Sequence, residues 1–210
     1  MRLAQLAGLE SIIAKMVCHN TTMLGIFGLL SGILPVLGVI PYDRDILKHK
    51  TKPHRGSFLI WSVLGGVAFF TQLAQGGTWS LFLPGADTVA TLSIFILSIW
   101  YGVGGLNKRD VLGLLLAALG LALWAITRQP LAALLITIGV DLVGTILTLI
   151  KTWEDPDGET FSSWFLAALG GIFAVFAVGR VSFGLLLYPI YIFCANASVN
   201  VVMFLRRKSH

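Results

Sequence analysis

Residues 141–164 read DLVGTILTLIKTWEDPDGETFSSW, and an earlier stretch, residues 38–61, GVIPYDRDILKHKTKPHRGSFLIW, has the same layout. Three landmarks of the earlier stretch recur in the later one at a constant offset of 103 positions: Lys48 with Lys151, Pro53 with Pro156, and Trp61 with Trp164. A period of about half the chain predicts two homologous halves rather than an array of short repeats.

The composition excludes an ordinary water-soluble domain. Of the 210 residues, 56% are hydrophobic and 12% are charged, and the mean hydropathy is +0.85. Apolar runs close to the roughly 20 residues needed to cross hydrocarbon recur along the chain. The net charge of +5 does not indicate a nucleic-acid partner, because the basic residues cluster in short loops and at the C-terminus. The expected partner is the lipid bilayer.

The apolar runs predict an all-α integral membrane protein with seven transmembrane helices, over residues 22–42, 57–76, 86–105, 111–127, 131–151, 161–179 and 182–205. The stretches between them carry glycine, proline and charge, as in TKPHRG, PGAD and EDPDGE. We expect two parallel three-helix repeats joined by a linker helix, in a 3+1+3 order. The expected units are the first repeat 21–106, the linker 107–129, the second repeat 130–205 and a basic tail 206–210.

Residues 1–20 are expected to form a separate amphipathic segment. Their apolar residues can share one helix face, while Glu10 and Lys15 make a membrane crossing costly, so an interfacial helix is favoured. A start of translation at Met16 or Met23, which would make this segment dispensable, stays open.

The distribution of basic residues predicts the orientation. Eleven of the 15 lysines and arginines fall in the loops and tail on one side of the seven predicted spans. Such an excess marks the cytoplasmic side, which places the C-terminus in the cytoplasm and the N-terminus outside, in a plasma or inner membrane.

Two corresponding segments resemble the signature of the PQ-loop superfamily, which includes the SWEET sugar transporters and the Pnu-type vitamin-precursor transporters. The first segment reads Pro41-Tyr42, Ile46-Leu47-Lys48, Pro53 and Ser57, and the second reads Gly144-Thr145, Leu149-Ile150-Lys151, Pro156 and Thr160. The glutamine of the signature is absent from both, and Gly144 replaces the second proline; either residue lets a helix bend. The resemblance covers almost the whole chain. It implies a carrier that moves a small polar solute, such as a sugar, a nucleoside or a vitamin precursor, by alternating access.

The resemblance also implies residues for a site near mid-membrane. SWEET-like carriers use an asparagine on the last helix of each triplet, which matches Asn196, and the residue 103 positions earlier is Ser93. Trp61 and Trp164 are expected to gate the cytoplasmic side, although tryptophan at span ends also forms interfacial belts. Pro41, Tyr42, Gly144, Thr145 and Pro189 are the expected gate or hinge positions.

Asp141 is the most informative residue, because it falls in the middle of the fifth predicted span. An ionised carboxylate there costs several kcal/mol unless it is paired or hydrated. We expect it to bind solute or to couple transport to a proton or a cation; a structural hydrogen bond to a neighbouring helix is the alternative. Asn200 and Gln72 are further candidates, since membrane amides serve as ligands and as contacts between helices. Gln72 is expected to line an outward vestibule.

No motif for catalysis, metal binding or a cofactor is found, and we expect no paired carboxylates inside the spans. The protein is therefore not expected to be an enzyme. A membrane receptor or scaffold that does not transport is the alternative function, with the acidic loop Glu154–Glu159 as its docking surface. We leave homo-oligomer formation open.

Overall fold

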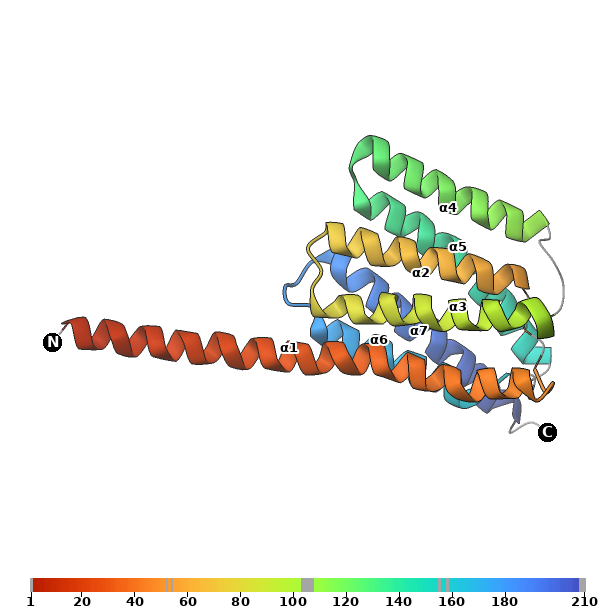
Figure 1. Ribbon diagram of the computed structural model, residues 1–210, viewed down its shortest axis with the longest axis horizontal. Helices are drawn as coiled ribbons and strands as arrows, with labels where there is room; N and C mark the ends of the chain where they lie inside the picture. The colour runs from red at the N-terminus through yellow and green to blue at the C-terminus, as the bar shows by residue number, and fades with distance from the viewer. Residues whose placement is uncertain are drawn as a thin grey trace.

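The computed structural model describes residues 2–51, 53, 55–102, 108–154, 156–157 and 159–207. The regular structure of this part of the chain is entirely helical, which confirms the all-α part of the expected fold class (Figure 1). The elements are α1 (Arg2–Leu47), α2 (Arg55–Ala74), the 3₁₀ helix η1 (Trp79–Leu81), α3 (Phe82–Tyr101), α4 (Lys108–Thr127), α5 (Pro130–Glu154), α6 (Phe161–Ala177) and α7 (Phe183–Arg207).

Five helical stretches among the described residues are long and apolar enough to cross a membrane. They are Thr21–Leu47, Arg55–Ala74, Trp79–Tyr101, Pro130–Glu154 and Phe183–Arg207. α6 is also apolar, with 17 residues, and α4 is not among the five. Their outer faces carry large exposed apolar side chains, such as Ile40, Val89 and Val143. Soluble proteins rarely expose apolar surface on this scale, so these faces are compatible with contact to lipid.

α1 runs without a break through residue 20, where a separate segment was expected. Its 46 residues correspond to a length of about 69 Å, and its N-terminal part projects beyond the other helices (Figure 1). Residues 2–20 contain no proline and are rich in alanine, leucine and other good helix formers. Nothing in this local sequence stops the helix, so it continues into the first apolar run.

The helices pack in a regular order. α3 packs against both α1 and α2, and α7 packs against both α5 and α6. Between these two groups, α1 lies along α6 and α2 lies along α5. α4 contacts α5 and α2 and lies on the outside of the bundle (Figure 1).

The bundle has two ends that matter for the site. At one end, called here the basic end, lie the last residues of α1, α3, α5 and α7 and the loops that follow α1 and α5; this end is on the right in Figure 1. At the other end, the η1 end, lie η1 and the loop between α6 and α7. A buried apolar cluster fills the bundle toward the η1 end, formed by Ala68, Leu83, Leu134, Ala174, Tyr188 and Ile192.

Candidate solute-binding cavity

A cavity of about 550 Å³ lies between the helices. Residues of α1, α2, α3, α5, α6 and α7 line it, so both groups of three helices contribute. Asp87 and Tyr188 mark its deep end, and Thr51, Pro53 and Glu159 mark its limit in the loops at the basic end. Since the apolar cluster fills the space beyond Tyr188, the cavity reaches the basic end and stops short of the η1 end.

Asp141 lines this cavity from α5 and is held by two hydroxyl groups. The Tyr191 hydroxyl, from α7, donates a hydrogen bond to Asp141 Oδ2. Thr145, one turn further along α5, donates to the same oxygen at 3.4 Å, and the Thr145 and Tyr191 hydroxyl oxygens are 3.3 Å apart. These contacts give Asp141 a partner on a neighbouring helix, and they leave the side chain beside an open space.

A second carboxylate, Asp87 of α3, also lines the cavity. Tyr188 of α7 and Asp141 of α5 line the same cavity as Asp87. The Oδ2 atom of Asp87 is buried and has no hydrogen-bond partner among the described residues.

The expectation of no paired carboxylates inside the spans was therefore wrong. The PGAD stretch was interpreted as a connector, whereas Pro84 and Gly85 lie in the first turn of α3. Proline is tolerated there, because the first turn of a helix has no internal partner for its N–H groups. The helix thus begins earlier and carries Asp87 inward.

Aromatic side chains line the same cavity as the two carboxylates. Tyr42, Trp61, Trp164, Tyr188 and Tyr191 all line the cavity. The Trp61 ring packs edge-on against Phe58, with a centroid distance of 5.1 Å. Both predicted gate tryptophans thus border the cavity rather than forming an outer belt.

Two further expected gate positions, Tyr42 and Thr145, also reach the cavity, but Pro41 and Pro189 do not line it. Pro189 is fully buried inside α7, which continues through it. Gly144 lies against the Trp61 indole, where an added Cβ would come within 3.2 Å of Nε1.

The lining residues correspond between the two halves of the chain. Five pairs are related by 103 positions: Pro35 with Ile138, Gly38 with Asp141, Tyr42 with Thr145, Trp61 with Trp164, and Leu64 with Ala167. In α3 and α7 the relation is instead 101 positions: Asp87 with Tyr188, Ala90 with Tyr191, Thr91 with Ile192, and Ile94 with Ala195. Corresponding positions of the two halves therefore face one space.

The change of offset explains one misplaced candidate. Asn196 lines the cavity, where its Nδ2 donates to the Ile192 carbonyl at 2.8 Å. Ser93 does not line it; its hydroxyl is 3.2 Å from Asp43 Oδ2 and 2.8 Å from the Ala90 carbonyl. With an offset of 101, the position in α3 that corresponds to Asn196 is Phe95.

Two other amide candidates lie away from this cavity. Gln72 is fully buried in α2, and neither of its side-chain polar atoms has a partner among the described residues. Asn200 borders a separate apolar hollow between α6 and α7, and its Nδ2 donates to the Asn196 carbonyl at 3.3 Å.

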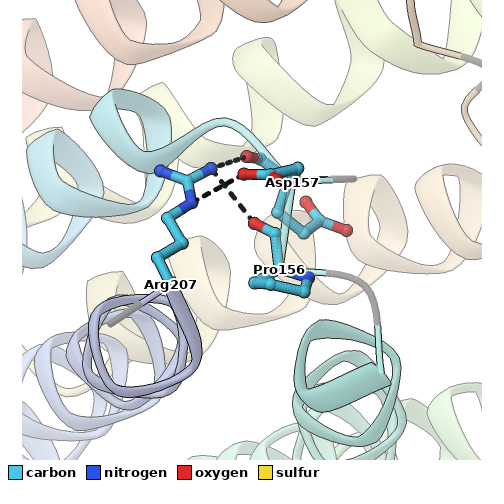
Figure 2. A network of polar contacts seen from close by, with 4 residues as sticks. Pro156, Asp157 and Arg207 are labelled. Carbon is cyan, nitrogen blue, oxygen red and sulfur yellow. Dashed lines mark hydrogen bonds and ion pairs between the residues drawn. The ribbon is translucent and has the colours of Figure 1, made fainter. Parts of the chain in front are cut away.

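The C-terminal end of α7 is tied to the loop at the mouth of the cavity. Figure 2 shows Arg207 reaching Pro156 and Asp157: Nε is 2.9 Å from Asp157 Oδ1, and Nη2 donates to the Pro156 carbonyl at 3.1 Å. The same loop carries Glu159, whose Oε2 accepts a hydrogen bond from Trp164 Nε1 at 3.0 Å. Asp157, part of the acidic loop considered as a docking surface, is thus paired within the chain.

The first half has a similar tie at the basic end. Arg55, at the start of α2, donates from Nε to the Ser98 carbonyl at 2.7 Å and from Nη2 to the Gly102 carbonyl at 3.0 Å. An arginine thus joins each half's described residues near the mouth of the cavity to the end of that half's third helix.

The described residues contain no group of three or more histidine, cysteine, aspartate or glutamate side chains suited to a metal ion. Comparison of the chain with protein-family models, with curated proteins and with solved structures gives no match. The functional interpretation therefore depends on the cavity itself.

Proposed function

We propose that this protein is an integral membrane carrier that moves a small polar solute through the cavity by alternating access. The observation that carries the proposal is the matched lining, in which corresponding residues of the two halves, such as Trp61 and Trp164, border one space of about 550 Å³. Cavities of this volume accommodate small organic molecules. Repeats that meet at a shared site are typical of secondary transporters.

The packing of the helices supports the two-bundle arrangement that this mechanism needs. In each proposed bundle the third helix lies between the first and the second: α3 between α1 and α2, and α7 between α5 and α6. The contacts between the bundles follow the same symmetry. The first helix of each half packs against the second helix of the other half: α1 against α6, and α5 against α2. α4, outside both, then serves as the linker of a 3+1+3 fold.

The shape of the cavity supports a cycle with two states. It reaches the basic end, which the excess of lysine and arginine assigns to the cytoplasm, and the apolar cluster fills the η1 end. This is the form expected of an inward-facing carrier. To release solute on the other side, the bundles would separate at Ala68, Leu83 and Leu134 and close around Trp61 and Trp164.

Solute uptake by reconstituted protein tests the proposal. Vesicles containing the full chain are loaded with unlabelled sugars, nucleosides, amino acids or organic cations, and entry of the corresponding labelled solute is measured. We expect saturable exchange for one class, reduced at least tenfold in Trp61→Ala and Trp164→Ala. Trp100→Ala is the matched control, because Trp100 is 69% exposed on the outside of α3 and should exchange normally.

Absence of saturable exchange for every class would overturn the carrier and favour the receptor or scaffold. Equal loss in Trp100→Ala would show that removing any tryptophan damages the fold, and the cavity tryptophans would then carry no specific role.

A further inference from the structure

We propose that the solute is an organic cation, with its charged group between Asp87 and Asp141 and its apolar part against the aromatic side chains of the cavity. This inference deepens the proposed function and rests on it in one respect, that the cavity is the carrier's binding site. It concerns binding, so it can be tested apart from transport.

The charge of the lining is the first reason. Asp87, Asp141 and Glu159 all border the cavity, and no lysine, arginine or histidine does so within the described part of the chain. Charges interact strongly in a low-dielectric interior, so an anionic solute would be repelled. A neutral solute would bring no counter-charge to Asp87 and Asp141, and a carboxylate without one is costly inside a membrane.

The partners of the two carboxylates are the second reason. Asp141 accepts a hydrogen bond from Tyr191 of α7, and Tyr188 of the same helix lines the cavity with Asp87. Asp87 Oδ2 is buried without a partner among the described residues. A buried carboxylate oxygen without a donor is costly, and a bound ammonium or guanidinium group would satisfy it.

The aromatic residues distinguish an organic cation from a metal ion or a lone proton. Trp61, Trp164 and Tyr42 line the same cavity, and aromatic side chains attract ammonium and guanidinium groups through their π-systems. A metal ion is usually held by several ligands close together, and the described residues hold no group of three or more histidine, cysteine, aspartate or glutamate side chains suited to one. A proton would need neither this space nor the apolar side chains, such as Ile94 and Ile138, that line it.

A pair of probes with one shape and different charge tests the inference on the wild-type protein. Choline and 3,3-dimethyl-1-butanol have the same shape, but an uncharged carbon atom in the butanol replaces the positively charged quaternary nitrogen of choline. Binding of each to the purified full chain in detergent is measured by calorimetry, with tetramethylammonium and benzyltrimethylammonium as smaller and larger cations. We expect at least one cation to bind, and choline to bind at least tenfold more tightly than its neutral counterpart.

Charge-neutral variants then locate the site. Asp87→Asn and Asp141→Asn should each weaken cation binding at least tenfold, because each removes one counter-charge while keeping the side-chain shape. Glu154→Gln is the matched control: Glu154 is an exposed acid at the end of α5, the helix that carries Asp141, and its removal should leave binding unchanged.

The outcomes separate the two proposals. Equal binding of choline and the alcohol, or binding of neutral sugars or nucleosides in place of every cation, would overturn the cationic class and leave the carrier standing. Cation binding that depends on Asp87 and Asp141, combined with no exchange in vesicles, would support the inference and overturn the carrier. The comparison of choline with the alcohol uses the wild type, so it holds even if a variant fails to fold.

Discussion

Hydroxyl groups rather than a basic side chain hold Asp141 in place, and this determines how the residue can be tested. Tyr191 donates one hydrogen bond to Asp141 Oδ2, and Thr145 donates a second at 3.4 Å. Tyr191→Phe removes one donor to a charged group in the interior, a loss that typically costs about 1–3 kcal/mol. We expect a lower unfolding temperature in detergent and weaker solute binding.

A double-variant cycle shows whether Tyr191 acts through Asp141. In the Asp141→Asn background, Tyr191→Phe should cost clearly less than in the wild type, because the carboxylate it serves is gone. Tyr101→Phe is the control; Tyr101 lies at the end of α3, where its ring packs against His49. Additive losses in the double variant would contradict the coupling.

At this scale, the residues that repeat or that stand out against an apolar background could be predicted from the sequence. Asp141, Trp61 and Trp164 all line the cavity, as does Asn196. Asp87 could not be found in this way, because a proline and a glycine just before it have the appearance of a loop. The signal that could have revealed it is the tolerance of a first helical turn for proline.

Among the helices, α6 shows most directly how small residues permit close packing. A Cβ added at Gly171 would come within 2.7 Å of the Phe193 backbone nitrogen in α7, and one added at Gly170 would come within 2.8 Å of Pro35 in α1. Membrane helices commonly approach closely at small residues, because packing replaces the hydrophobic effect between them. α6 thus packs closely against α7 in its own bundle and against α1 in the other.

Gly171→Ala should therefore destabilise the protein, by about 1–3 kcal/mol if neighbours shift to relieve the overlap. Gly66→Ala is the matched control, because a Cβ at Gly66 would meet nothing within 4 Å and alanine favours a helix. Thermal unfolding in detergent should show a loss for the first variant and no loss for the second. Equal behaviour of the two would mean that the contact between α6 and α7 is not close-packed.

The helix boundaries show where sequence reasoning loses precision. α5 begins at Pro130, one residue from its expected start, and α7 covers Phe183–Arg207 against an expected 182–205. α3 begins at Phe82, four residues before its expected start, after the short η1 turn. That one-turn shift is the physical reason why Asp87 was missed. Corresponding positions of α3 and α7 are also 101 residues apart instead of 103. For this reason Ser93, chosen with an offset of 103, does not correspond to Asn196.

For the whole molecule, the repeat in the sequence predicted two similar halves, but it could not predict which faces of them meet. That information comes from tertiary packing, in which α1 lies along α6 and α2 along α5. In the same packing the cavity reaches the basic end and is closed at the η1 end, a feature that hydropathy does not encode. An alternating-access carrier must open the η1 end and close the basic end during its cycle, and this change can be measured.

Accessibility of single cysteines tests this change. Starting from a chain with Cys18 and Cys194 replaced by serine, Ser57→Cys places a thiol in the cavity near the basic end, and Ala68→Cys places one in the buried cluster near the η1 end. Val181→Cys, in a loop residue 94% exposed at the η1 end, reports the orientation of each vesicle. A thiol reagent that does not cross membranes is applied to vesicles of known orientation.

Without solute, Ser57→Cys should react only from the side opposite Val181→Cys, and Ala68→Cys should react from neither. During exchange of a transported solute, Ala68→Cys should become reactive from the Val181 side while labelling of Ser57→Cys slows, because one end opens as the other closes. Labelling of Ser57→Cys from the Val181 side in resting vesicles would mean that the cavity opens at the η1 end. An Ala68→Cys thiol that stays unreactive throughout exchange would contradict a cycle in which the η1 end opens.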